Sequence, residues 1–365
     1  GTVYNGLKKL PAAHYLEYSA EGSTLVNYWL PHFTESTSGS DFSALAAELR
    51  TTLKQAVRRA LPAQGRYGAF LSGGLDSSTV TGMLSEMAEG QAQAYAIGFS
   101  AEGYDEMAYA RITARHFGVN LNEYYVTPED VVEALPLVAT SYDEPFGNSS
   151  ALPAYFCARM AASDGVDTLL AGDGGDELFA GNERYTKQNV FELYGKVPAL
   201  LRRGLIEPLL HVLPKTLPLV SKANSYIEQA NTPLPDRLQS YNFLHRHAAA
   251  EIFSADFLDA IDTDEALQLQ REIYHRPNGA GDLNRMLYLD WQITLADNDL
   301  RKVGHMCAMA GVDVTYPMLD DALLELSCNV PPEWKIKGSD LRHFFKEALR
   351  GWLPDETLSK SKQGF

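Results

Sequence analysis

The sequence predicts an α/β protein in which a doubly wound, mainly parallel sheet precedes a mostly helical C-terminal half. Between residues 67 and 171, short apolar runs alternate with stretches of helical periodicity, which is typical of a parallel sheet covered by helices on both faces. After about Phe179 the strand signals fade, and apolar residues at helical spacing dominate to the end. The length of 365 residues favours about two domains.

The individual elements follow from the same patterns. Residues 1–33 contain short apolar and aromatic runs broken by glycine and proline, so we expect strands and turns there. Ser40 and Asp41 can cap a first helix. One face of that helix is apolar, with residues at spacings of three and four: Phe42, Leu45, Leu49, Leu53, Val57 and Leu61. Strands are then predicted at 67–71, 92–99, 122–126 and 166–171, and helices at 76–88, 105–117, 128–141 and 149–162.

Composition and charge narrow the class of partner. The net charge of −16 argues against nucleic acid and anionic membranes, which attract clustered lysine and arginine. The most apolar stretch, 205–220, is interrupted by charged residues and prolines, so no segment is predicted to span a bilayer. Three cysteines without a CxxC spacing favour a reducing compartment. We therefore expect a cytoplasmic protein without a nucleic acid or membrane partner.

The most informative segment lies where the strand at 67–71 ends and the next helix begins: Phe70-Leu71-Ser72-Gly73-Gly74-Leu75-Asp76-Ser77-Ser78. The two glycines allow a tight turn and a close approach of the backbone to a ligand, and the serines add hydroxyl donors at a helix N-terminus, so the predicted ligand is an oxyanion. The segment is neither a Walker loop nor a dinucleotide fingerprint. Since Asp76 would repel a bare phosphate, its presence implies a divalent metal. The alternative is a serine-glycine turn with Asp76 as a helix cap.

A second cluster follows the strand at 166–171: Ala171-Gly172-Asp173-Gly174-Gly175-Asp176-Glu177-Leu178-Phe179. The carboxyl ends of parallel strands meet at one edge of a sheet, so Asp173 and Asp176 are expected to face the first segment. With Asp76 they would form a site of hard oxygen ligands suited to Mg²⁺. An acidic glycine-rich turn or half of a calcium loop is the alternative interpretation.

Both segments closely resemble the pyrophosphatase loop and the acidic motif of the asparagine synthetase family. The resemblance extends from about Tyr28-Trp29-Leu30-Pro31 to the last residue and includes further motifs: Asp143-Glu144-Pro145-Phe146, Ser150-Ala151-Leu152-Pro153, Tyr316-Pro317-Met318-Leu319-Asp320, residues 346–350 and Lys362-Gln363-Gly364-Phe365. It implies a sheet of the adenine-nucleotide alpha-hydrolase (PP-loop) type. It also implies an AMP-forming ligase: a substrate carboxylate attacks the α-phosphate of ATP, pyrophosphate leaves, and ammonia or another amine displaces AMP.

The resemblance also implies roles for individual residues. It assigns the nucleotide to Phe70, Leu71, Ile97, Gly98, Ala171 and Gly172, and the leaving pyrophosphate to Ser72, Gly73, Gly74, Ser77 and Ser78. Asp76 and Asp176 are the implied Mg²⁺ ligands, and Asp173 is placed near the intermediate, where it would orient the amine. Lys362 is implied to stabilise negative charge in the transition states, the alternative being a solvated lysine in the C-terminal tail.

Lys346 is a weaker catalytic candidate. Arg342, Lys346 and Arg350 recur at intervals of four residues, which would place them on one helix face, and such a face is usually solvated.

Two regions depart from the family pattern. Residues 1–33 look like the remnant of an N-terminal glutaminase-like domain, before a sheet domain at 34–180 and a helical part with the acceptor site at 181–365. We therefore expect the chain as given to use free ammonia or an amine. Where aspartate-using relatives carry an Asp-Arg pair and a Glu-x-Arg, this chain has Gly304-His305 and Asp313-Val314-Thr315. The loss of these arginines removes bidentate partners for a substrate carboxylate. We therefore expect the acceptor to be either aspartate or another small carboxylic acid.

Three functions remain open: amidation of a small acid, intramolecular lactam formation by the same adenylation chemistry, and a non-catalytic nucleotide-binding scaffold. The oligomeric state is open as well, a homodimer included.

Overall fold

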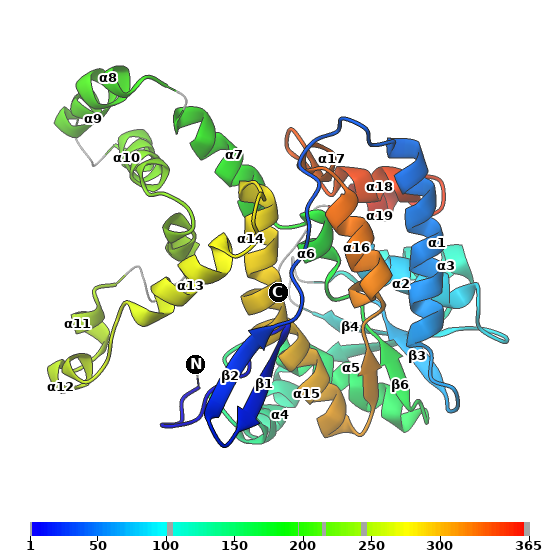
Figure 1. Ribbon diagram of the computed structural model, residues 1–365. Helices are drawn as coiled ribbons and strands as arrows, with labels where there is room; N and C mark the ends of the chain where they lie inside the picture. The colour runs from blue at the N-terminus through cyan, green and yellow to red at the C-terminus, as the bar shows by residue number, and fades with distance from the viewer. Residues whose placement is uncertain (1, 101–104, 196, 214–216, 242–246, 361–365) are drawn as a thin grey trace. The chain divides into compact units, whose positions relative to one another are not determined.

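The computed structural model describes residues 2–100, 105–195, 197–213, 217–241 and 247–360 (Figure 1). The chain divides into two compact units, one formed by residues 1–181 together with 290–365 and the other by residues 182–289. The second unit begins at Asn182, one residue after the position at which we expected the helical part to begin. Residues 290–365, however, which we expected in the helical part, belong to the unit that contains the sheet.

The first unit is built on a sheet of five parallel strands in the order β5-β4-β3-β6-β7. The strands are β3 (Tyr67–Phe70), β4 (Gln93–Phe99), β5 (Asn120–Val126), β6 (Thr168–Leu170) and β7 (Asp313–Thr315). From β3 the chain proceeds outward through β4 and β5, and it then returns to the other side of β3 through β6 and β7. The strand order therefore reverses between β3 and β6, which confirms the predicted doubly wound α/β class.

Helices connect these strands as the sequence predicts. They are α1 (Phe42–Ala60), α2 (Leu75–Ser85), α3 (Met107–Phe117), α4 (Pro128–Ser141), α5 (Ala151–Ser163) and the short α6 (Gly175–Phe179). Asp41 caps α1, because its carboxylate accepts the backbone N–H groups of Ser43 and Ala44 at 2.9 and 3.1 Å. The apolar face predicted for α1 is buried at Leu49, Leu53 and Val57.

The C-terminal part adds a fifth strand that the sequence pattern does not predict. Its elements are η4 (Trp291–Asp299), α15 (Leu300–Ala310), β7, η5 (Pro317–Leu319), α16 (Asp321–Asn329), α17 (Pro332–Lys335), β8 (Ile336–Lys337), β9 (Asp340–Leu341), α18 (His343–Leu349) and α19 (Asp355–Ser359). The expectation that strands end with the first half is wrong at β7, which pairs with β6 from Thr168↔Asp313 to Leu170↔Thr315. Three residues are too few to show the alternation by which strands are recognised.

The core of this unit explains why residues 290–365 belong to it. Buried residues of α5 and α15 pack with β4 and β6, among them Tyr95, Cys157, Leu169 and Cys307. Helix α15 therefore covers the sheet beside α5, although the two helices are far apart in sequence. This packing places η4 and α15 close to the carboxyl ends of the central strands.

The N-terminal residues form the strands and turns that we expected. Strands β1 (His14–Ser19) and β2 (Gly22–Asn27) pair antiparallel, from His14↔Asn27 to Ser19↔Gly22. The segment before β1 contacts the Asp143-Glu144 motif: the Val3 N–H donates to Glu144 Oε1 at 3.0 Å, and Lys9 lies 3.5 Å from Glu144 Oε2.

The second unit is helical throughout its described residues, as predicted for this part. Its elements are α7 (Glu183–Gly195), α8 (Ala199–Leu201), η1 (Arg202–Ile206), α9 (Glu207–Val212), α10 (Pro218–Asn231), η2 (Asp236–Tyr241), α11 (Ala249–Ile252), α12 (Ala255–Asp259), α13 (Glu265–His275) and α14 (Asp282–Asp290). Buried Arg237 ties several of them together, since it donates to Glu192 at 3.0 Å, Gln188 at 3.2 Å and the Thr232 carbonyl at 2.8 Å.

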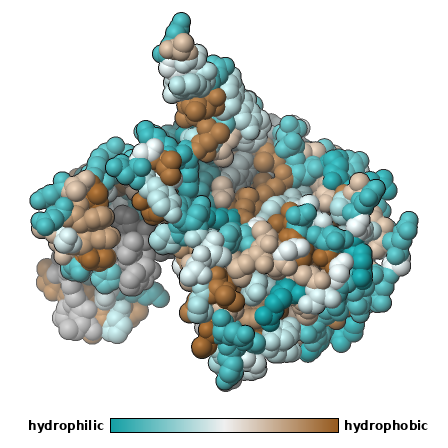
Figure 2. Space-filling model, turned by 90° about the horizontal axis from the view of Figure 1, so that it is seen from below, coloured by the Kyte–Doolittle hydropathy of each residue, from teal (hydrophilic) through white to brown (hydrophobic). Residues whose placement is uncertain are grey.

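Large hydrophobic side chains are exposed in both units, for example Tyr18 in β1 and Leu200 in α8. On the face drawn in Figure 2, apolar groups interrupt a largely hydrophilic surface. None of the described helices is both long enough and apolar enough to cross a lipid bilayer.

Candidate functional site

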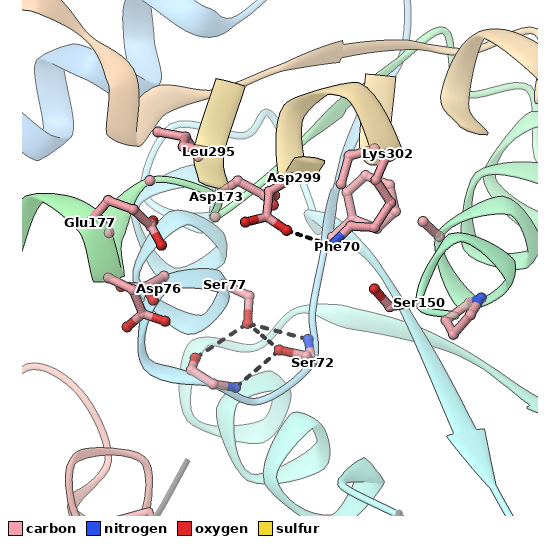
Figure 3. A pocket seen from close by; sticks show the side chains of 18 residues that line it. Phe70, Ser72, Asp76, Ser77, Ser150, Asp173, Glu177, Leu295, Asp299 and Lys302 are labelled. Atoms are coloured by element: carbon pink, nitrogen blue, oxygen red, sulfur yellow. Dashed lines mark hydrogen bonds and ion pairs between the residues drawn. The ribbon is translucent and has the colours of Figure 1, made fainter. Parts of the chain in front are cut away.

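A pocket of about 370 Å³ opens at the carboxyl ends of β3 and β6, where the strand order reverses (Figure 3). This is the position at which doubly wound sheets bind ligands. Four parts of the first unit line it: the β3–α2 loop, the start of α5, the β6–α6 loop, and η4 with α15. The lining residues are Phe70, Ser72, Gly74, Asp76, Ser77, Ser150, Pro153, Ala154, residues 172–177, Leu295, Asp299, Lys302 and Val303.

The β3–α2 loop turns sharply at Gly73, which has a φ of +73°. A side chain at this position would be strained, and its Cβ would lie 2.4 Å from the backbone nitrogen of Ala110 in α3. Helix α2 begins directly after Gly74, so its first backbone N–H groups and the positive end of its dipole face the pocket. The loop therefore has the properties of an anion cradle.

Hydroxyl groups hold the loop closed. Ser72 Oγ and Ser77 Oγ lie 3.1 Å apart, and Ser77 Oγ also accepts the Ser72 N–H and donates to the Gly74 carbonyl, both at 3.3 Å (Figure 3). The Gly74 N–H donates in turn to Ser72 Oγ at 3.3 Å. The two serine hydroxyls that line the pocket are thus fixed by the loop's own backbone.

The β6–α6 loop approaches α2 so closely that only glycine fits at two positions. A Cβ at Gly172 would lie 2.7 Å from the Ser77 nitrogen, and a Cβ at Gly175 would lie 2.1 Å from Asp76 Oδ1. The predicted meeting of the two sequence motifs at one sheet edge is therefore observed.

Asp76 and Asp176 converge on a single point. Asp76 Oδ2 and Asp176 Oδ1 each lie 2.7 Å from Nη1 of Arg342, and all three side chains are at least four-fifths buried. The interpretation of Arg342 as one residue of a solvated helix face is wrong. Arg342 precedes α18 with a φ of +55°, and this backbone turn directs its side chain inward to the carboxylates.

The donor set at this point fits Mg²⁺. Two carboxylates whose oxygens surround one cationic nitrogen offer the hard ligands that Mg²⁺ prefers, and Mg²⁺ commonly takes its remaining ligands from phosphate oxygens and water. Two protein carboxylates are all that this point offers, since no group of three or more His, Cys, Asp or Glu side chains in the described ranges is arranged to hold a metal ion.

Asp173 lies between the β3–α2 loop and the wall of the pocket that η4 and α15 form (Figure 3). Burial raises the pKa of Asp173 to about 6, although the positive charge of Lys302 acts in the opposite direction. Lys302 Nζ donates to Asp299 Oδ1 at 3.1 Å (Figure 3). Segment η4 is a π-helix, a form often found at functional sites, and its last turn carries Leu295 and Asp299 into the pocket.

Six predicted nucleotide and pyrophosphate residues are not among those that line the pocket: Leu71, Gly73, Ser78, Ile97, Gly98 and Ala171. Leu71 and Ala171 are buried, and their N–H groups extend the sheet by donating to the carbonyls of Tyr95 and Thr315, both at 2.9 Å. Ile97 and Gly98 lie at the carboxyl end of β4. Ser78 is buried, and its hydroxyl pairs with Thr113 Oγ1 at 2.9 Å.

Lys346 is not among the described residues that line the pocket. Lys346 Nζ donates to Asp340 Oδ1 at 2.7 Å on α18. Lys362 lies outside the described residues, which end at Lys360 in this region.

No sequence motif identifies three residues of the site: Arg342, Asp299 and Lys302. Each lies in a helical or turn region far from both glycine-rich segments, and a single charged residue in such a region is typical of a solvated surface. One feature of the sequence could have indicated two of them: Asp299 and Lys302 are opposite charges three residues apart, a spacing that brings side chains together on a helix.

These features define a class: an α/β protein with an anion-binding loop and paired carboxylates at the switch point of its sheet. Sequence comparison gives the family, because the asparagine synthase family matches residues 48–365. The chain belongs to the asparagine synthase family.

Several named relatives are similar to the chain. It is 25% identical over 321 residues to asparagine synthetase (glutamine-hydrolyzing) 1 of Bacillus subtilis, covering 88% of this chain and 49% of that protein. It is 32% identical over 202 residues to putative asparagine synthetase (glutamine-hydrolyzing) 2 of Methanocaldococcus jannaschii, covering 55% and 39%. The chain thus spans about half the length of the Bacillus relative.

Among solved structures, the NH3-dependent NAD synthetase of Campylobacter jejuni matches with 14% sequence identity and a TM-score of 0.26, over 39% of this chain and 60% of that one.

Proposed function

We propose that this chain is an ATP-dependent amide-forming ligase. The carboxylate of a small acid attacks the α-phosphate of ATP, pyrophosphate leaves, and ammonia displaces AMP from the acyl-adenylate. The observation that carries the proposal is the convergence of an anion cradle and paired carboxylates on one pocket, in a chain of the asparagine synthase family.

The nucleotide is proposed to lie with its phosphates on the β3–α2 loop. The N-terminus of α2 and the hydroxyls of Ser72 and Ser77 would bind pyrophosphate oxygens, in a loop that only Gly73 allows to turn so tightly. The backbone at the ends of β3, β4 and β6, from Phe70, Ile97 and Ala171 onward, would surround the adenosine.

Asp76 and Asp176 are proposed to hold Mg²⁺. When bound there, Mg²⁺ supplies positive charge that neutralises phosphate oxygens as pyrophosphate leaves. Glycines at 175 and 181 leave room for the two carboxylates: a Cβ at Gly181 would lie 1.7 Å from Asp176 Oδ1.

Asp173 is proposed to orient the attacking amine and to accept a proton from it. A pKa of about 6 leaves this carboxylate ionised at neutral pH, yet close enough to neutrality to exchange a proton. Lys302 is the one basic residue among the described side chains that line the pocket, so we assign to it the binding of the acceptor's carboxylate before adenylation.

Lys362 and Lys346 keep the roles that the family resemblance gives them. Lys362 is proposed to stabilise the negative charge that develops in both transition states. Lys346 would need to leave Asp340, 2.7 Å away, to reach a substrate, and its catalytic role remains a prediction.

The acceptor is proposed to be a carboxylic acid other than aspartate. Besides Lys302, helix α15 carries two basic side chains, and both contact other parts of the protein. Arg301 donates to Glu144 at 2.8 Å, and His305 stacks on Tyr142 with ring centroids 4.2 Å apart. Neither offers the free guanidinium that would bind the second carboxylate of aspartate in a bidentate pair.

Residues 1–33 are proposed to be the end of a glutaminase-like domain. In a longer protein, that domain would supply the ammonia that the chain as given would take from solution.

The test is pyrophosphate release from ATP and Mg²⁺, screened over small carboxylic acids with and without ammonium. Pyrophosphate with one acid, followed by an amide only with ammonium, is the expected result. Amide formation without ammonium from an acid that carries its own amine would indicate lactam formation instead. ATP binding without pyrophosphate release with any acid would contradict the proposal and indicate a scaffold.

A further inference from the structure

Arg342 occupies the point at which the proposed metal carboxylates meet. Its Nη1 atom is 2.7 Å from Asp76 Oδ2 and 2.7 Å from Asp176 Oδ1, and its side chain is 12% exposed. One nitrogen therefore serves both carboxylates. Their mutual repulsion in a poorly hydrated site is reduced by this one positive charge, which leaves the three groups with a net charge of −1.

A divalent metal and this guanidinium exclude each other. Mg²⁺ binds oxygen ligands at 2.0–2.1 Å, so a metal shared by these two oxygens would need the space that Nη1 fills between them. The two cations would also repel each other at such a distance. Metal binding to both carboxylates thus requires Arg342 to move.

The attachment of Arg342 is suited to such a movement. A guanidinium has five N–H donors, and the polar contacts described for this one all involve Nη1. The residue lies in the turn between β9 and α18 with a φ of +55°, in a conformation that residues with a side chain rarely adopt. An arginine with a fixed structural role is typically held by several of its donors and by a relaxed backbone.

We propose that Arg342 is a displaceable internal cation, which holds Asp76 and Asp176 together in the metal-free protein and leaves them when a divalent metal binds. The inference rests on the proposed function in one respect, namely that these carboxylates are the metal ligands. It predicts that metal affinity is reduced by competition from a side chain of the protein itself.

The test is the affinity of the full chain for Mn²⁺ without nucleotide, measured from the electron paramagnetic resonance signal of the free ion. Arg342→Met is expected to bind Mn²⁺ about tenfold more tightly than wild type, because a positive charge 2.7 Å from each carboxylate is removed. Arg350→Met is the matched control: Arg350 follows the same helix, is exposed and pairs with Glu347, and its replacement should leave the affinity unchanged. Equal or weaker Mn²⁺ binding by Arg342→Met would overturn the proposal.

A second measurement covers the case in which Arg342→Met does not fold without metal. Refolding is then attempted with and without Mn²⁺. Recovery only with Mn²⁺ supports exchange of one cation for the other, whereas failure under both conditions means that Arg342 has a fixed structural role and overturns the proposal. Because no ATP or acid is present, these results are independent of pyrophosphate release, which tests the proposed function in the wild-type chain.

Discussion

The two walls of the pocket are built in different ways. The phosphate wall consists of the β3–α2 and β6–α6 loops, in which glycines and serines within a few residues of one another shape the backbone. The acceptor wall consists of η4 and the start of α15, in which side chains such as Asp299 and Lys302 project from a helix. Both walls carry carboxylates. The first adds backbone N–H and hydroxyl groups, whereas the second carries Lys302, the one basic residue among the described side chains that line the pocket.

We expect the first wall to serve nucleotide binding, which members of a family share, and the second wall to serve the choice of acid, in which members differ. A backbone cradle binds any nucleotide phosphate in the same way, whereas a helix can change its side chains without changing its path. Substitutions in the phosphate wall should therefore impair ATP use with every acid. Substitutions in the acceptor wall should change which acid is used.

The largest effect is expected for Asp76→Asn in the phosphate wall. Loss of a charged metal ligand removes several kcal/mol of charge stabilisation, so pyrophosphate release should fall about 10³-fold with any acid. A continuous pyrophosphate assay measures this change. Asp297→Asn is the control, since Asp297 is exposed on η4 and its replacement should leave the rate near wild type. A rate for Asp76→Asn within tenfold of wild type would contradict the proposed metal site.

The next effect concerns Asp173 of the β6–α6 loop, whose carboxylate is influenced by the charges of Lys302 and Asp299 in the acceptor wall. Asp173→Asn should lower the rate of amide formation by about 10²-fold at neutral pH, because the amide cannot accept a proton. The ionised carboxylate is the active form and its pKa is raised to about 6. The ratio of wild-type to variant kcat/KM for the amine should therefore fall as the pH drops through 6.

This ratio cancels the protonation of the amine itself, which is the same for both proteins. A ratio that stays constant from pH 5 to pH 8 would exclude Asp173 as the proton acceptor.

The same division explains how much could be predicted from the sequence. The geometry of the phosphate wall was predictable because it resides in local backbone turns and close approaches, which Gly73, Gly74 and Gly175 indicate directly; its binding of phosphate stays a prediction. The acceptor wall and Arg342 were not, because their roles arise from tertiary packing: α15 reaches the pocket only by packing on α5, and Arg342 points inward only because of its backbone turn. Strand β7 was missed because its three residues are too few to show the alternation by which strands are recognised.

A smaller effect is expected from glycine substitutions, which separate loop geometry from backbone strain. Gly73 and Gly118 have similar φ angles of +73° and +66°, but a Cβ would meet Ala110 only at Gly73, and at Gly118 nothing lies within 4 Å. Both alanine variants should lose about 1 kcal/mol of stability through backbone strain, and Gly73→Ala should lose more, because its Cβ would overlap the backbone of α3. Only Gly73→Ala should also weaken ATP binding, by roughly 30-fold, because the crowded loop must shift.

Thermal unfolding and calorimetric titration with ATP measure these two effects separately. Equal ATP affinity of Gly73→Ala and Gly118→Ala would mean that the loop does not bind the phosphates.

The smallest effect is expected in the acceptor wall. Lys302→Met should raise the KM for the acid about tenfold, since a charged hydrogen bond to the substrate carboxylate is lost, while the KM for ATP stays unchanged. Lys54→Met is the control, because Lys54 is an exposed lysine of α1 that pairs with Glu86. If Lys302→Met instead raised both KM values equally, Lys302 would act on the nucleotide. That result would contradict the division of the pocket into a phosphate wall and an acceptor wall, because Lys302 is the one basic residue among the described side chains that line it.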